Sequence, residues 1–161
     1  MKRRYPDAPV AAVGVIVLRE DEGDEPRILL VRREAPPAAG KWSIPGGAVE
    51  IGEPVREAAV REVMEECGLE VNLHGVYDVF DIIVRDGEGK VEYQYVLVDF
   101  VASPVTVEPR PASDAGDARW VGLSEALGMD LTKGTREVVM RLMNARNMGA
   151  AASRWGLPQL R

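Results

Sequence analysis

Residues 47–69 read GAVEIGEPVREAAVREVMEECGL, and this stretch decides the fold that we expect. Glu62, Glu65 and Glu66 stand at helical spacing, so on a helix they fall within one arc of about 100°. A second, nearly opposite arc holds the apolar side chains of Val60, Val63, Met64 and Cys67. We therefore expect an amphipathic helix with one buried face and one acidic face.

The limits of this helix are well marked in the sequence. Pro54 suits the first helical position, because its missing N–H would have no intrahelical partner there. Gly68 follows the last apolar turn and can take the positive φ that commonly ends a helix. The prediction is a helix from about Pro54 to Cys67. The preceding Pro45-Gly46-Gly47 disfavours regular structure and lets backbone carbonyls approach a ligand or ion closely.

Taken alone, the three glutamates have two explanations: a solvated acidic face, which is common on helices, or a site for a divalent cation. The chain offers no convincing Ser-His or Cys-His pair, and its only histidine, His74, is better explained as a solvated or structural residue. If the carboxylates bind a cation, a water activated by that cation is the natural nucleophile.

Composition narrows the class of protein. The chain has 161 residues, of which 46% are hydrophobic, and this suits a single domain over residues 1–161. No apolar run approaches the roughly 18 to 20 residues that span a bilayer, and the N-terminus lacks the apolar region of a signal peptide. The single cysteine, Cys67, fits a reducing cytoplasm, and we expect it to be buried and inert.

The charge of the chain limits its partners. A net charge of −6 and a pI near 4.9 argue against a nucleic-acid polymer, because binding phosphates takes clustered Lys and Arg. A small anionic substrate would also be repelled unless bound cations reversed the local field. The acidic composition therefore makes a metal more necessary.

The remaining sequence predicts mostly strands. Ala11 to Leu18 and Arg27 to Arg33 are apolar runs separated by a polar turn, and they predict a hairpin. Val76 to Val84 and Val91 to Val101 predict a second one. A short strand is expected at Ala118 to Val121.

Two further helices are expected near the C-terminus. Ser124 can cap a brief helix, and Thr132 or Thr135 can open a longer one that ends near Met148. The tail from residue 149 begins Ala-rich and is expected to be loose. Strands combined with a few helices indicate a sheet sandwiched between helices.

The opening stretch resembles the signature box of the Nudix hydrolases, and each fixed position of that box is matched. The matching residues are Gly47, Glu53, Arg61, Glu62, Val63, Glu65, Glu66, Gly68 and Leu69. The resemblance covers roughly residues 10–148 and implies the α/β (α+β) Nudix fold, an α/β/α sandwich with a central mixed β-sheet. It also implies hydrolysis of a nucleoside diphosphate linked to another moiety, X, by attack of water on one phosphorus.

The resemblance assigns metal ligands by position. It implies that Glu62 and Glu66 are the principal ligands of magnesium, or of manganese, with Glu65 as a further ligand or a contact to metal-bound water. The carbonyl of Gly46 matches a backbone ligand of the family.

The catalytic and supporting roles follow from the same match. Glu53 and Arg61 resemble an ion-paired brace that fixes the loop against the helix, and a structural role is their main interpretation. The catalytic base varies within the family, and Glu62, Glu65 or an acid from a later loop remain the alternatives.

A later loop resembles the family segment in which an acidic residue precedes a Trp-Val strand. Asp114 could supply a distal metal ligand, and Asp117 could serve there or contact substrate. The alternative is a solvated acidic loop. Trp120 itself is expected to pack rather than to stack on a base.

The branch of the family is indicated more weakly. Residues 41–47 (KWSIPGG) and 95–100 (YVLVDF) are similar to bacterial proteins labelled ADP-ribose pyrophosphatase. About fifteen residues past the box, some ADP-ribose enzymes carry a proline and some dinucleoside-polyphosphate enzymes a tyrosine. This chain has VRDG at 84–87 and carries neither marker.

Aromatic and basic residues are candidates for substrate binding. Trp42 and, from predicted strands, Tyr77, Phe80, Tyr93 and Tyr95 could stack on a base, although packing is the commoner fate in strands. The candidates for holding phosphates are Arg32, Arg33 and Arg85. Besides ADP-ribose hydrolysis, the alternatives are a hydrolase that removes oxidised or non-standard nucleoside triphosphates, and a nucleotide-sensing module, which usually lacks box carboxylates. Dimers are common among relatives, and a homodimer would be compatible with each of these three functions.

Overall fold

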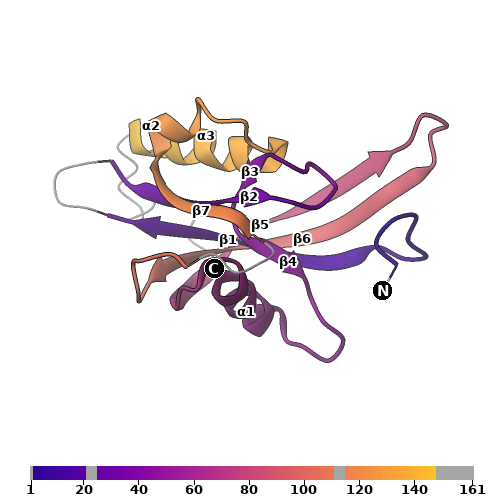
Figure 1. Ribbon diagram of the computed structural model, residues 1–161, viewed down its shortest axis with the longest axis horizontal. Helices are drawn as coiled ribbons and strands as arrows, with labels where there is room; N and C mark the ends of the chain where they lie inside the picture. Colours follow the sequence, from indigo (N-terminus) through magenta and orange to yellow (C-terminus); the bar gives the residue numbers. More distant parts are fainter. Residues whose placement is uncertain (1, 21–24, 111–114, 148–161) are drawn as a thin grey trace.

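The structure, a computed structural model, describes residues 2–20, 25–110 and 115–147. These residues form a seven-stranded mixed sheet with three helices. In chain order the elements are β1 (Val10–Arg19), β2 (Arg27–Arg33), β3 (Trp42–Ser43), β4 (Gly46–Ala48), α1 (Val55–Cys67), β5 (Val71–Arg85), β6 (Val91–Pro104), β7 (Ala115–Gly122), α2 (Leu123–Ala126) and α3 (Lys133–Asn147). The sheet lies between α1 on one side and α2 and α3 on the other, as the predicted sandwich requires (Figure 1).

The sheet combines one parallel ladder with antiparallel ones. Its strand order is β3-β2-β1-β6-β5, with β4 paired to β1 and β7 paired to β2. β1 and β6 run parallel, and the other described ladders are antiparallel. Both predicted hairpins are present, and β5 and β6 extend further than expected, to Val71 and Pro104.

β1 and β2 pair only where β1 ends and β2 begins. Their ladder joins Leu18 to Ile28 and Arg19 to Arg27. Further along, β1 pairs with β4 and β2 pairs with β3. The segment 42–48 therefore lies where the two strands have separated, and it connects the two parts of the sheet.

The prediction of irregular structure at Pro45-Gly46-Gly47 is wrong, because Gly46 and Gly47 lie in β4. The missing side chain permits this pairing, since a Cβ at Gly46 would overlap the carbonyl oxygen of Val13 on β1. Trp42, which was expected outside the strands, lies in β3.

α1 has the predicted limits to within one residue. Pro54 is the N-cap, with an extended backbone, and Val55 is the first helical residue. Gly68 takes φ 66° at the C-cap and donates its N–H to the carbonyl of Met64 at 2.9 Å. The glycine therefore ends the helix in the way the sequence predicts.

The predicted buried face of α1 is correct only in part. Val63 and Cys67 are fully buried, whereas Val60 and Met64 are 38% and 42% exposed. Ala58 and Ala59 take their place against the sheet. The helix is rotated toward its alanines because small side chains let its axis approach the sheet closely, and this rotation draws the neighbouring glutamates inward.

Two apolar cores lie on the two faces of the sheet. The core under α1 includes Val13, Val15, Leu29 and Phe100. The core under α2 and α3 includes Ile16, Leu30, Val101, Val138 and Leu142. Within the described residues no helix is both long and apolar enough to cross a membrane.

The C-terminal helices correct one predicted cap. α2 begins after Gly122 without a side-chain cap, and Ser124 lies inside the helix, where its hydroxyl donates to Glu25 Oε2 at 2.7 Å. Glu25 also accepts the backbone N–H of Ser124 at 3.0 Å, so the carboxylate satisfies this helix end in place of the serine. For α3, Thr132 Oγ1 accepts the N–H of Thr135 at 3.3 Å, as a capping residue would. Met148 and the tail lie outside the described residues.

Candidate active site

Glycine brings β4 directly against α1. A Cβ at Gly47 would overlap the carboxylate of Glu62, so only glycine leaves room for that carboxylate at this position. The N–H of Gly46 points to Glu66 Oε1 at 3.4 Å. The strand and the helix therefore meet at the two glutamates that the sequence favours as ligands.

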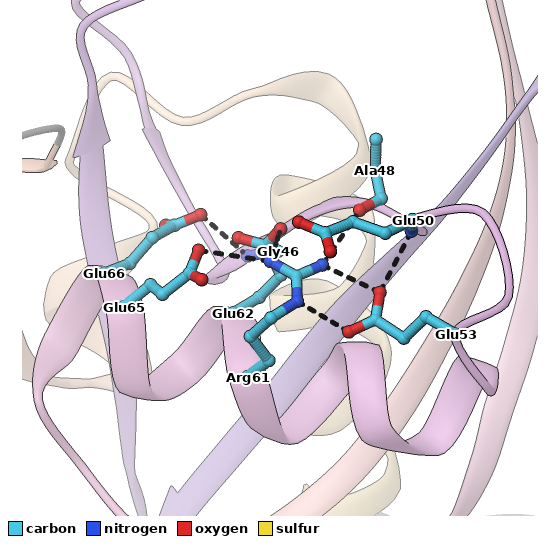
Figure 2. Close-up of polar contacts among 8 residues, drawn as sticks. All are labelled: Gly46, Ala48, Glu50, Glu53, Arg61, Glu62, Glu65 and Glu66. Carbon is cyan, nitrogen blue, oxygen red and sulfur yellow. Dashed lines mark hydrogen bonds and ion pairs between the residues drawn. The ribbon is translucent and has the colours of Figure 1, made fainter. Parts of the chain in front are cut away.

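Arg61 connects the loop before α1 to the acidic face of the helix (Figure 2). Its Nε and Nη2 donate to the two carboxylate oxygens of Glu53 at 2.6 and 3.0 Å, and Nη2 also donates to the carbonyl of Ala48 at 3.1 Å. Its Nη1 donates to Glu62 at 2.9 Å and to Glu65 at 3.1 Å. Such two-pronged contacts use the planar fork of arginine, which lysine lacks.

Glu53 is the partner of Arg61 in the loop before α1. Besides the guanidinium of Arg61, it accepts the backbone N–H of Glu50 at 2.9 Å. Hydrogen bonding by Arg61 holds the pKa of the Glu53 carboxyl below its usual value, so Glu53 is ionised at neutral pH. The ion pair that the sequence predicts is present, and it joins residues 48–53 to the second turn of α1.

Glu62 and Glu66 form a largely, though not fully, buried carboxyl pair. Burial is the main cause that raises the pKa of Glu62, and burial followed by the charge of Glu62 raises the pKa of Glu66 to about 8. Their mutual interaction lowers the pKa of Glu62 and raises that of Glu66. Two carboxyl groups so placed share a proton because they resist ionising together.

Glu65 differs from its two neighbours. Its side chain is 58% exposed, against 12% for Glu62, because the rotation of α1 turns it toward solvent and Arg61. Within the described residues, no three acidic, histidine or cysteine side chains converge as a ready metal cage. Glu62 and Glu65 both accept from Arg61 Nη1, so they lie on one face of the helix as predicted, but Glu65 lies at its exposed rim.

Trp42 and Asp117 both lie near Arg119, a residue that the sequence does not single out. The guanidinium of Arg119 lies 4.8 Å from the centroid of the Trp42 ring and donates twice to Asp117, at 3.0 and 2.8 Å. These contacts hold the pKa of Asp117 below its usual value. Asp117 is therefore an ion-paired strand residue, and Asp114 lies outside the described residues.

Two of the three candidate phosphate-binding arginines, Arg32 and Arg33, lie on opposite faces of β2, whereas Arg85 ends β5 and donates to the carbonyl of Gly89 at 3.0 Å. Arg33 faces the α1 side, where its charge lowers the pKa of Glu66, and its Nε donates to the carbonyl of Pro37 at 3.0 Å. Arg32 is exposed and pairs in register with Trp42. Tyr95 is half-buried in β6, opposite Val10 of β1. Among these candidates the structure brings only Arg33 to the carboxyl pair.

Three other residues considered in the sequence, Cys67, His74 and Trp120, have environments that suit structural roles. Cys67 is fully buried, and burial raises its thiol pKa to about 12, as expected of an inert thiol. His74 Nε2 lies 2.8 Å from Ser103 Oγ on the neighbouring strand. The indole N–H of Trp120 donates to the carbonyl of Val107 at 2.8 Å.

Sequence reasoning missed two buried polar residues. Asp99 and Ser43 are 2% and 6% exposed, and Asp99 Oδ1 and Ser43 Oγ lack a hydrogen-bond partner in the described part of the chain. A signal for Asp99 was available, because an aspartate interrupts the apolar run YVLVDFVA opposite a glycine, Gly14, in the apolar run of β1.

The family follows from comparison of the whole chain with known proteins. A family model described as the NUDIX domain matches residues 8–142. The chain belongs to the Nudix family. It is accordingly a Nudix hydrolase, an enzyme that acts on pyrophosphate bonds.

Two curated relatives and one solved structure show which Nudix proteins this chain is similar to. An ADP-ribose pyrophosphatase of Methanocaldococcus jannaschii is 33% identical over 72% of this chain and 63% of its own length. A putative 8-oxo-dGTP diphosphatase of Mycobacterium tuberculosis is 35% identical over 77% of this chain and 84% of its own. The crystal structure of a MutT NUDIX hydrolase from Burkholderia pseudomallei has a TM-score of 0.68 at 30% identity and covers 83% of this chain and 98% of that one.

Proposed function

We propose that this Nudix hydrolase cleaves a nucleoside diphosphate linked to another moiety, X, with water attacking one phosphorus, and that ADP-ribose is a substrate. The products would then be AMP and ribose 5-phosphate. The observation that carries the proposal is the buried carboxyl pair of Glu62 and Glu66, held against β4 by Gly46 and Gly47.

A divalent cation fits these residues. Glu62 and Glu66 resist joint ionisation, and a cation would remove that penalty by replacing their shared proton with two positive charges. Oxygen donors of this kind suit magnesium, with manganese as the alternative. The carbonyl of Gly46 and the rim carboxylate of Glu65 would complete the donor set. When bound, such a cation lowers the pKa of water and offsets phosphate charge.

The surrounding residues support this pair without needing to react. Arg61 and Glu53 fix the loop that carries β4 to the helix that carries the carboxylates. Arg33 faces Glu66 and would contact a phosphate oxygen there, because a guanidinium matches phosphate in charge and shape. Glu65 is exposed at the rim and, with Glu62, is a candidate to accept the proton of the attacking water.

The names of the relatives support two substrate classes. The Methanocaldococcus relative favours ADP-ribose, together with the similarity of residues 41–47 and 95–100 to that branch. The Mycobacterium relative favours the second candidate, hydrolysis of oxidised or non-standard nucleoside triphosphates to a monophosphate and pyrophosphate. A sensing module without activity is disfavoured, since the box carboxylates are all present.

A substrate panel separates these functions. The purified chain would be incubated with magnesium and either nucleoside diphosphate derivatives or triphosphates, with products identified by mass. We expect ADP-ribose to give AMP and ribose 5-phosphate, with turnover abolished by chelator and restored by magnesium. Pyrophosphate release from triphosphates alone would favour the second candidate, and no turnover of any compound would refute both.

A further inference from the structure

Asp99 is a buried acid that the proposed chemistry does not use. It lies on β6 with a side chain 2% exposed, and its Oδ1 has no hydrogen-bond partner among the described residues. An unpaired buried polar group costs stability, so such groups are rare and tend to mark functional sites. Its presence within an otherwise apolar strand needs an explanation.

Gly14 provides the space that Asp99 occupies. The two residues are register partners on the parallel strands β1 and β6. A Cβ at Gly14 would overlap Asp99 Oδ1 and would lie 2.9 Å from the δ-methyl of Ile44. The glycine thus leaves room for a carboxyl group beside Ile44, in the region where β1 and β2 have separated.

Among the described residues, no positive charge compensates Asp99. The titratable groups around it are Tyr77 and Asp78 on β5, and Arg141 of α3, while Gly14 and Ile44 bring none. Arg141 donates instead to Asp78 at 2.9 Å and to Glu137 at 2.7 Å. Burial, followed by the charge of Asp78, raises the pKa of Asp99 to about 7. The group is therefore a neutral acid over much of the acidic to neutral range, with one O–H donor and one acceptor oxygen.

Asp99 lies beside the segment that leads into β4. Ile44, which it adjoins, is two residues before Gly46, so the two backbone positions are at most about 7 Å apart. Gly14 itself pairs with Gly46 across β1 and β4. On the side of α3, the side chains of Ile44 and Tyr77 are only partly buried.

We propose that Asp99 recognises the adenine base of the substrate, with its O–H donating to a ring nitrogen and its other oxygen accepting the exocyclic amino group. This inference rests on the proposed function and adds the base to it. Adenine presents an acceptor and a donor side by side at N7 and N6, which a neutral carboxyl matches. Guanine presents two acceptors, N7 and O6, on the same edge, and one of them would face the carbonyl oxygen.

Two substitutions of Asp99 separate recognition from packing. Asp99→Asn keeps a donor and an acceptor, whereas Asp99→Leu keeps the branched shape of the side chain and removes both. The probes are AMP and GMP, whose binding is measured by calorimetry without turnover, and ADP-ribose and GDP-ribose, whose hydrolysis gives kcat and KM. For Asp99→Leu we expect the AMP Kd and the ADP-ribose KM to rise about tenfold or more, with kcat within about threefold and GMP binding unchanged. For Asp99→Asn we expect the preference for adenine to be retained.

The matched control is Asp81→Asn, which alters an exposed carboxylate on the same neighbouring strand, β5. It should leave the AMP to GMP ratio unchanged. Equal affinity of wild type and Asp99→Leu for AMP would overturn the inference, as would loss of the adenine preference in Asp99→Asn. Absence of hydrolysis by the wild-type chain would instead refute the proposed function, because the AMP measurement needs no turnover.

Discussion

At the contact of β4 with α1, the carboxylate of Glu62 fills the space that a side chain on Gly47 would need. A Cβ on the glycine would overlap that carboxylate. Gly47→Ala should therefore displace Glu62 while leaving both elements in place. We expect kcat/KM to fall about 100-fold, because displacements near 1 Å at a reacting centre have effects of this size. Steady-state kinetics on whichever substrate the panel identifies would measure the loss.

Gly134→Ala is the matched control for this substitution. Gly134 lies in the first turn of α3 with open space around its Cα, so alanine should fit there and favour the helix. Its activity should equal that of wild type, with an equal or higher Tm. If Gly47→Ala were as active as Gly134→Ala, the carboxylate position of Glu62 would not matter for turnover.

Replacing either member of the carboxyl pair by glutamine should separate activity from stability. Glu62→Gln and Glu66→Gln each remove a buried acid that ionises unfavourably, so the Tm should stay level or rise. Magnesium-dependent turnover should nevertheless fall at least about 100-fold, since an amide is a weaker cation ligand than a carboxylate. Glu57→Gln, at an exposed position in the first turn of α1, supplies the control. Retention of activity in either pair variant would remove these residues from the proposed metal site.

Arg61 should not tolerate lysine. A single ammonium cannot reproduce the contacts of the guanidinium with Glu53, Ala48 and Glu62 at once. We expect Arg61→Lys to lower kcat/KM about 10- to 100-fold and to reduce the Tm, with larger losses for Arg61→Ala. Proteolysis of residues 48–53 would report on the loosened loop. Unaltered activity and loop protection in Arg61→Lys would mean that charge alone suffices.

The limits of α1 and the positions of the hairpins could be predicted from the sequence, because they depend on residues that are close together in the chain. Pro54 and Gly68 mark the ends of α1, and apolar runs separated by polar segments mark the hairpins. The rotation of α1 was not readable, because Val60 and Met64 are as apolar as Val63. Only the sheet beneath the helix decides that Ala58 and Ala59 face it. The consequence reaches the site, since this rotation buries Glu62 and exposes Glu65.

Contacts between distant strands also escaped prediction. Arg119 and Trp42 are 77 positions apart, and they meet only because β2 lies between β3 and β7. The space that Gly14 leaves for Asp99 similarly depends on the parallel register of β1 and β6. Motif spacing can place box residues on one helix, whereas residues that contact the rest of a substrate come from several strands.

The pH dependence of stability should report on Asp99. Its pKa is raised to about 7 in the folded state, so between about pH 4 and 7 the unfolded chain loses a proton that the folded chain keeps. The free energy of unfolding therefore falls as pH rises through this interval, by an amount on the order of a few kcal/mol, and levels off above it. Asp99→Asn has no proton to lose, and its stability relative to wild type should increase over the same interval.

Urea unfolding of wild type and Asp99→Asn at pH 4.5, 6 and 8.5 would measure this difference. The gain from asparagine should be small at pH 4.5 and reach a plateau near pH 8.5, because Asp99 is ionised in both states there. Hydrogen bonding by Arg141 lowers the pKa of Asp78, so the contribution of Asp78 to stability changes only below about pH 4.5 and does not by itself produce a rise between pH 4.5 and 8.5. A gain that is the same at all three pH values would show that Asp99 does not keep its proton on folding, and the neutral donor needed for adenine would be lost with it.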